Sequence, residues 1–152
     1  MKVVLISTYE LGRQPFGLAS PAAWLRARGH DVVCLDLSRE AFDDGPVRAA
    51  DLVAFYVPMH TATRLAADLV APVRSLNPRA HLCFYGLYAP VNEDYLRALG
   101  VGTVLGGEFE EGLVSLAARL EQAPANASRN GGRQPGPVIS LSRQKFTVRP
   151  SH

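Results

Sequence analysis

Three features are scarce or missing in this sequence, and each absence excludes a class of protein. Its 152 residues include only two cysteines, Cys34 and Cys83, which form no metal-ligand spacing with each other or with a histidine. Each lies inside an apolar run, so we expect two buried thiols in a reducing compartment. No apolar stretch approaches the roughly 18 residues of a membrane-spanning helix, and the N-terminus has too few apolar residues for a secretory signal. We therefore expect a cytoplasmic protein without a membrane partner.

Acidic residues are missing from the end of the chain, which separates a tail from the rest. Residues 1–121 carry all 14 acidic residues against 11 basic ones, a net charge of −3, whereas residues 122–152 carry five basic residues and no acid. The first half of this tail has the Ala, Asn, Ser, Gly and Pro composition of a linker, and residues 138–148 alternate like an extended arm. We expect one α/β domain over residues 1–121 and a partly flexible tail over residues 122–152. The scattered basic residues favour a solvated linker over a nucleic-acid-binding segment.

Five short apolar runs alternate with helical patterns in the first 121 residues. The runs lack period-two alternation, which is typical of strands buried on both faces of a parallel sheet. They cover residues 3–6, 32–35, 52–57, 80–85 and 101–105. Alternation of strands and helices at this spacing predicts right-handed crossovers between parallel strands. The expected fold is a five-stranded parallel flavodoxin-like (Rossmann-like) sheet of order 2-1-3-4-5, with helices on both faces.

Local signals predict where the helices begin. Ser20-Pro21 is typical of an N-cap followed by proline in the first turn, and Thr61 or Thr63 is expected to cap the helix after the third strand. Asn92 is expected to cap the next helix, ahead of two acidic residues.

Other residues have structural interpretations. Trp24 and Leu25 are expected to face the core from the first helix. His30 and His81 precede strands, so we expect both at the surface or at a boundary. His60 follows the third strand and is the histidine expected on the ligand side of the sheet.

The loop after the first strand, residues 9–17, is the expected wall of any binding site. In open parallel sheets, ligands bind in the crevice outside the carboxyl ends of the strands. The other segments expected at this edge follow the third, fourth and fifth strands, at residues 58–61, 86–87 and 106–108.

Several chemistries that this fold supports elsewhere lack their residues here. A phosphate-accepting receiver domain needs an acidic pair after the first strand and an Asp after the third, but those places hold Ser7-Thr8 and Val57-Pro58. A dinucleotide-binding loop needs G-x-G-x-x-G directly after the first strand, whereas Gly12 and Gly17 are too far apart, with a proline between them. Ser7-Thr8 faintly resembles the phosphate loop of a flavodoxin, which leaves a nucleotide- or flavin-binding domain as an alternative.

Four segments follow one another in an informative order. They are G-L-A-S-P-A-A-W-L-R-A-R-G-H-D-V at residues 17–32, D-L-V at 51–53, the glycine turn at Gly86, and G-V-G-T-V-L-G-G-E-F-E-E at 100–111. In order and spacing they resemble cobalamin-binding domains, in particular the N-terminal domain of cobalamin-dependent radical SAM proteins. The resemblance covers residues 1–121, and the tail is similar to the segment that leads into the catalytic barrel of those enzymes.

The resemblance implies a place for the cofactor and a partner. In that family cobalamin lies across the carboxyl ends of the strands, with its nucleotide tail in a pocket beside the first strand. The residues implied for cofactor binding are Gly12, Gln14, Gly17, Tyr56, Pro58, Met59, His60, Thr61, Gly86, Leu87, Gly106, Gly107 and Glu108. No catalytic residue and no metal ligand is implied. The chain lacks a C-x-x-x-C-x-x-C cluster motif, so the implied partner is a radical SAM catalytic domain or chain.

The sequence departs from the family at the cobalt ligand. Cobalamin domains carry D-x-H-x-x-G after the first strand, and with Gly17 as the last residue of that motif the Asp and His positions hold Gly12 and Gln14. The S-x-L motif after the third strand falls on Tyr56-Val57-Pro58, and the paired glycines after the fourth on Gly86-Leu87. These departures leave two alternatives: cobalamin held without a histidine ligand, or a vestigial domain that binds no cofactor and docks to a radical SAM partner.

Overall fold

The computed structural model describes residues 1–9 and 16–122. The elements in this part of the chain are β1 (Lys2–Ser7), α1 (Phe16–Ala27), β2 (Asp31–Asp36), α2 (Asp44–Ala49), β3 (Leu52–Tyr56), α3 (His60–Leu76), β4 (His81–Tyr85), the 3₁₀ helix η1 (Pro90–Asn92), α4 (Glu93–Ala98), β5 (Thr103–Leu105) and α5 (Phe109–Gln122). Gly12, Gln14 and the predicted arm at residues 138–148 lie outside the described residues.

The strands form one parallel sheet in the order β2-β1-β3-β4-β5. This order confirms the predicted flavodoxin-like α/β fold. The register places the last residues of four strands in one row, because Ser7 of β1 pairs with Tyr56 of β3, Tyr56 with Tyr85 of β4, and Tyr85 with Leu105 of β5. This row marks the carboxyl edge of the sheet, where the sequence predicts the site.

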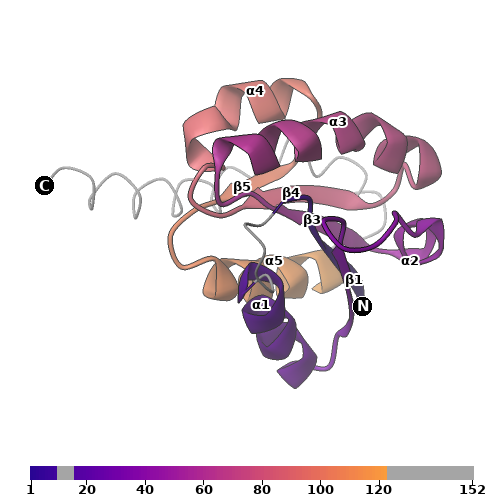
Figure 1. Ribbon diagram of the computed structural model, residues 1–152. Coiled ribbons are helices and arrows are strands. Elements are labelled where there is room, and N and C mark those ends of the chain that lie inside the picture. The colour runs from indigo at the N-terminus through magenta and orange to yellow at the C-terminus, as the bar shows by residue number, and fades with distance from the viewer. Residues whose placement is uncertain (10–15, 123–152) are drawn as a thin grey trace, which may run out of the picture.

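Helices cover both faces of the sheet (Figure 1). Helices α2, α3 and α4 pack on one face, and α1 and α5 pack on the other. Successive side chains of a strand point to opposite faces, so Val4 and Ile6 enter the core under α3 while Val3 and Leu5 enter the core under α1 and α5. Both cores are apolar, which explains why the strands lack polar alternation. Within the described residues, no helix combines the length and the apolar character needed to cross a membrane.

Three helix starts differ from their local sequence signals. Helix α1 begins at Phe16, so Ser20 is not its cap and Pro21 lies inside the helix. Helix α3 begins at His60, and the Oγ1 of Thr63 donates back to the Met59 carbonyl at 3.0 Å rather than capping the first amides. The side-chain amide of Asn92 donates to the Tyr88 carbonyl at 2.8 Å and makes no cap bond to α4. Thr63 and Asn92 thus each use their side chain on a carbonyl four residues earlier, and the Ser20 hydroxyl donates to the Oε2 of Glu110 on α5 at 2.8 Å.

Burial also departs from expectation at several side chains. Trp24 is 46% exposed, so it does not face the core. His30 and His81, expected at the surface or at a boundary, are both buried. Cys83 is fully buried as predicted, whereas Cys34 is only half-buried because β2 is an edge strand.

His81 forms a buried polar contact at the amino-terminal edge of the sheet. Its Nε2 lies 2.7 Å from the Oγ1 of Thr103 on the neighbouring strand β5. Burial, together with the positive charges of Arg74 and Arg97, lowers the pKa of His81 from 6.5 to about 4. The folded protein therefore holds this imidazole neutral at pH values where a solvated histidine is charged.

We expect His81 to make the stability of the fold depend on pH. Between pH 6.5 and about 4 the unfolded chain binds a proton at His81 that the folded chain does not bind, so the free energy of unfolding should fall as the pH is lowered through this range. A shift of this size corresponds to at most ~3 kcal/mol. In urea unfolding, His81→Gln should lose this part of the pH dependence, whereas His60→Gln, at an exposed position, should keep it. Identical pH profiles for wild type and His81→Gln would contradict the assignment.

Candidate functional site

The candidate site is the carboxyl edge of the sheet, which we call the carboxyl rim. It consists of the segments that follow β1, β3, β4 and β5, namely Thr8 and residues 57–61, 86–88 and 106–108, together with the start of α1 at residues 16–17. Parallel sheets bind ligands at this edge because the loops that leave the strands converge there.

Backbone hydrogen bonds continue beyond the strands and hold the rim in place. The Val57 amide donates to the Tyr85 carbonyl at 2.8 Å, and the Tyr88 amide donates to the Val57 carbonyl at 3.1 Å. Gly86 connects these bonds with a φ of +122°, and a Cβ there would lie 2.9 Å from the Val57 carbonyl oxygen. Only glycine satisfies both conditions, so the glycine turn that resembles the cobalamin family has a structural cause.

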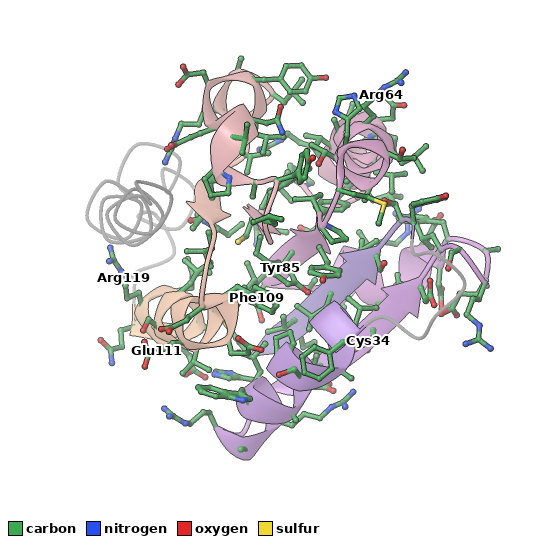
Figure 2. All side chains as sticks on the ribbon, turned by 60° about the vertical axis from the view of Figure 1, so that its left-hand side comes forward. Cys34, Arg64, Tyr85, Phe109, Glu111 and Arg119 are labelled. Atoms are coloured by element: carbon green, nitrogen blue, oxygen red, sulfur yellow. The ribbon has the colours of Figure 1, made fainter. Side chains whose placement is uncertain are left out.

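Three aromatic rings fill the space behind the rim on the face covered by α1 and α5. The ring centroids of Tyr56 and Tyr85 are 5.5 Å apart, and Phe109 at the start of α5 lies 5.8 Å from Tyr56 and 5.1 Å from Tyr85. Figure 2 shows Tyr85 next to Phe109. Gly17 of α1 closes this group, because a Cβ at Gly17 would lie 2.2–2.4 Å from atoms of the Tyr56 ring. We call Tyr56, Tyr85 and Phe109 the aromatic cluster.

A hydrogen bond joins the aromatic cluster to α1. The Tyr85 hydroxyl is buried and donates to the Gly17 carbonyl at 2.7 Å. In an α-helix that carbonyl accepts from the amide four residues later, which here is Pro21, a residue without an N–H. Tyr85 therefore supplies the donor that Pro21 lacks, and this explains how a proline is tolerated inside α1.

The Ser7-Thr8 segment is not arranged as a phosphate loop. The Oγ1 of Thr8 donates to the Ala62 carbonyl at 3.0 Å and ties β1 to the first turn of α3. Ser7 is fully buried, and within the described part of the chain its Oγ has no hydrogen-bond partner. Because Ser7 pairs with Tyr56, this lone polar atom lies at the carboxyl end of β1, beside the aromatic cluster. Buried hydroxyls are normally paired, so Ser7 is an exception among the buried polar groups of the described residues.

The sequence-predicted site residues divide into three groups. Gly17, Gly86 and Gly106 are buried, and each glycine makes room for another part of the chain: the Tyr56 ring, the Val57 backbone and Pro90, respectively. Tyr56, Pro58 and Met59 are half-buried, and His60, Thr61, Leu87, Gly107 and Glu108 are exposed. Gly12 and Gln14 lie outside the described residues. The structure thus brings the predicted residues after β3, β4 and β5 together at one edge.

Sequence reasoning missed the roles of Tyr85 and Phe109. The sequence predicts Tyr85 only as the last residue of the fourth strand and includes Phe109 only in the segment at residues 100–111, and neither is among the predicted site residues. The available signal was Pro21, since a proline inside a helix leaves a carbonyl in need of a donor, but the helix start at Phe16 had to be known first.

The described residues contain no cluster of side chains that could bind a metal ion. No group of three or more His, Cys, Asp and Glu side chains in this part of the chain is arranged to hold a metal ion. His60 is exposed at the first position of α3, whereas His30 and His81 are buried, and His81 lies at the opposite edge of the sheet.

Comparison with known proteins gives no family. No protein-family model matches the chain, and no curated protein matches it. Among solved structures, the adenylate cyclase from Rhodopirellula baltica is 11% identical with a TM-score of 0.48, covering 97% of this chain and 96% of that one. CapF in complex with the inhibitor 3-isopropenyl-tropolone is 13% identical with a TM-score of 0.44 over 70% of this chain, which spans 30% of the CapF chain. Likenesses this distant assign no function.

The bond between Tyr85 and Gly17 can be measured with a double-mutant cycle. Tyr85→Phe should lower the free energy of unfolding by roughly 1–3 kcal/mol, because it leaves a buried carbonyl without a donor. In a Pro21→Ala background the new amide can donate to Gly17, so Tyr85→Phe should cost clearly less. Tyr95→Phe, at an exposed position, is the control and should change little in either background. Additive effects of Tyr85→Phe and Pro21→Ala would contradict the explanation for Pro21.

Proposed function

We propose that residues 1–121 form a cobalamin-binding-like domain of a radical SAM protein, located in the cytoplasm. In this proposal the domain holds a corrinoid across the carboxyl rim, gives the cobalt no histidine ligand, and leaves catalysis to a radical SAM domain or chain. The observation that carries the proposal is the rim itself, in which close-packed glycine turns lie beside exposed apolar side chains. Leu87 is 63% exposed next to Gly86, and Phe16 is 72% exposed at the start of α1.

A rim of this composition fits the ring of a corrinoid. Exposed apolar side chains gain by being covered, and the exposed Gly107 lets a flat macrocycle approach the backbone after β5. Met59 and Pro58 are half-buried after β3 and extend the same apolar surface. When bound, a corrinoid supplies a cobalt centre for transfer of a carbon group. The residues of this chain would orient the ring and keep water from one of its faces.

The nucleotide tail of the cofactor does not fit in the same way. The family resemblance implies a tail pocket beside the first strand, and the rings of Tyr56 and Tyr85 occupy the space there. Tyr85 is held by its bond to Gly17, and Tyr56 rests on the Cα of Gly17. We therefore infer that the tail stays outside the domain, and that the site recognises the ring alone.

Binding of two corrinoids tests this proposal. Cobalamin and cobinamide, which lacks the nucleotide tail, should bind with affinities within about tenfold of each other, and the absorption spectrum should lack histidine ligation. Tyr56→Ala removes one ring from the tail space, so it should strengthen the binding of cobalamin but not of cobinamide. Tyr95→Ala, at an exposed position on α4, is the matched control and should change neither affinity.

Two results would contradict the proposal in different ways. Cobalamin binding far tighter than cobinamide in the wild type would show that the tail enters the domain. If neither corrinoid binds at millimolar concentration, the corrinoid-binding proposal is excluded and the docking proposal remains.

A docking domain without cofactor is the second candidate. It is favoured by the filled tail space and by four exposed apolar residues between the turn before η1 and the residue that follows α4. These residues are Leu87, Val91, Tyr95 and Leu99. Contiguous exposed apolar side chains are typical of protein interaction sites. The partner in this proposal is a radical SAM chain.

The docking proposal can be tested with a purified radical SAM protein as the binding partner. The double variant Val91→Ser, Tyr95→Ser should weaken binding to that protein by roughly tenfold or more, as expected for the centre of an interface. Trp24→Ser removes another exposed aromatic, from α1 on the other face of the sheet, and should leave binding unchanged. Equal losses in both variants, or none in the double variant, would exclude this face.

A nucleotide- or flavin-binding domain that uses Ser7-Thr8 is less well supported. The Thr8 hydroxyl donates to the Ala62 carbonyl. Ser7 is fully buried on the face of the sheet that carries the aromatic cluster. Neither hydroxyl is offered to a phosphate from solvent.

A further inference from the structure

The free edge of β2 is the most open part of the sheet. β2 pairs with β1 on one side only, and its residues Val33, Cys34 and Asp36 are half-buried. All three residues of β5, the strand at the other edge, are buried. An edge strand presents unpaired N–H and C=O groups and is a ready template for another strand. β2 is therefore the edge at which a sixth strand can be added.

Backbone hydrogen bonds show which groups of β2 face outward. The amide of Asp31, the first residue of β2, and the amide of Leu37, just after its last, donate to the neighbouring β1 segment at 3.0 and 2.8 Å. Successive residues of a strand bond to alternate sides in a parallel sheet. Val32, Cys34 and Asp36 therefore direct their amides and carbonyls toward the free edge.

Two side chains occupy the ends of this outward row. The Arg26 guanidinium donates to the Val32 carbonyl at 2.7 Å, and the Asp36 amide donates to the Oε2 of Glu40 at 3.0 Å. Between these contacts lies Cys34, beside which the described part of the chain places no strand on the outer side. The middle of the edge can thus take two main-chain hydrogen bonds, through the amide and the carbonyl of Cys34.

Helix α5 brings the chain close to this edge. The Oε2 of Glu121, near the end of α5, accepts from the Met1 amine at 3.3 Å and lies 4.0 Å from the Nδ1 of His30. Because Met1 precedes β1 and His30 precedes β2, α5 ends beside the amino ends of both strands. The next 15 residues, 123–137, span up to about 50 Å when extended, which is enough to reach the free side of β2.

The handedness of the crossover selects the β2 edge. Helix α5 covers the same face of the sheet as α1, which connects β1 to β2 (Figure 1). Crossovers between parallel strands are right-handed, so a helix on this face leads to a strand on the β2 side. A parallel strand next to β5 would need a left-handed crossover through α5.

The tail contains a segment whose polarity fits the edge. Residues 138–148 read V-I-S-L-S-R-Q-K-F-T-V, in which three of the first four residues are apolar and two basic residues follow. Val33 and Cys34 point to opposite faces of β2 and are half-buried. Side chains of a neighbouring strand would cover both, and the apolar start of the segment gains by doing so.

Charge favours the parallel direction. The turn after β2 is acidic, because residues 36–44 include four acidic residues and one basic residue, and three of the acidic ones are exposed. In a strand parallel to β2, Arg143 and Lys145 follow the apolar residues and lie toward this turn. An antiparallel strand would place the same basic residues toward the amino end of β2. Attraction between opposite charges therefore supports the direction that the crossover requires.

We propose that residues 138–148 form a sixth strand of the same chain, parallel to β2, which gives the sheet the order 6-2-1-3-4-5. This strand pairs with the outward groups of Cys34 and closes an edge that another protein chain could otherwise use. It runs toward the carboxyl edge of the sheet and brings the residues after it to the β2 side of the carboxyl rim. The proposal does not depend on what binds at the rim.

Amide hydrogen exchange in the 152-residue chain tests the proposal. The double variant Ser140→Pro, Leu141→Pro removes two successive amides, one of which faces β2 in either register. The Cys34 amide should exchange roughly tenfold or more faster in this variant than in the wild type, because its opening no longer requires a strand to detach. Ala127→Pro, Ser128→Pro is the matched control in the linker and should exchange as the wild type does.

Reversal of charge tests the direction of the strand. Arg143→Glu, Lys145→Glu brings two acidic residues to an acidic turn, so it should raise the exchange rate of the Cys34 amide severalfold. Arg129→Glu, Arg133→Glu reverses the same number of charges in the linker and should have a smaller effect. A larger effect of the linker pair would contradict the parallel direction.

Two results would overturn the sixth strand. Equal exchange of the Cys34 amide in the wild type and in Ser140→Pro, Leu141→Pro would show that the segment does not pair with β2. Protection that appears only as the protein concentration is raised would show that a second copy supplies the strand. The Leu35 amide, which faces β1, should stay protected in every variant and thereby show that the sheet is intact. Corrinoid binding is measured separately, so the two proposals can fail independently.

Discussion

The hydrogen bond from Tyr85 to Gly17 links the last residue of a central strand to the first turn of α1. It satisfies the carbonyl that Pro21 leaves without a helical donor, and it draws α1 against the carboxyl edge of the sheet. Tyr56 can then pack on the bare Cα of Gly17, and Phe109 brings the start of α5 against both tyrosines. The α1–α5 face is closed at its carboxyl end by this group of contacts.

This closure decides how the rim can act. The space beside β1 at the carboxyl edge is filled by rings of the chain itself, while the outer surface of the rim stays exposed and apolar at Leu87 and Phe16. A site of this form favours recognition of a broad surface over insertion of a group into the core. Both proposals for the rim, a corrinoid ring and a protein partner, follow from that surface, and they differ in what covers it.

The two edges of the α1 face differ in a complementary way. Near β3 and β4 the space under α1 holds large aromatic rings, whereas at β2 it holds Cys34 against two alanines and remains open. The same helix therefore closes one pocket and leaves another.

The predicted strands were right because a strand buried on both faces must be continuously apolar, and the runs at β1, β3 and β4 have that property. The sheet order followed from the strand and helix alternation, since right-handed crossovers allow few arrangements. Helix starts were less predictable. Ser20, Thr63 and Asn92 are good caps in isolation, but in the fold their neighbours offer other partners or the helix begins elsewhere. Burial of His81 and exposure of Trp24 were also missed, since each depends on which strand or helix lies opposite.

By itself the sequence determined the α/β class, the parallel sheet and the edge at which rim residues gather, because these depend on local apolar patterns and on chain connectivity. Only the tertiary structure decided that the space behind the rim is filled and that the space beside β2 is open. Both depend on the sizes of residues that face each other across the α1 interface from positions far apart in the chain, such as Gly17 and Tyr56. No local pattern carries that information, since it arises only when the helix is docked on the sheet.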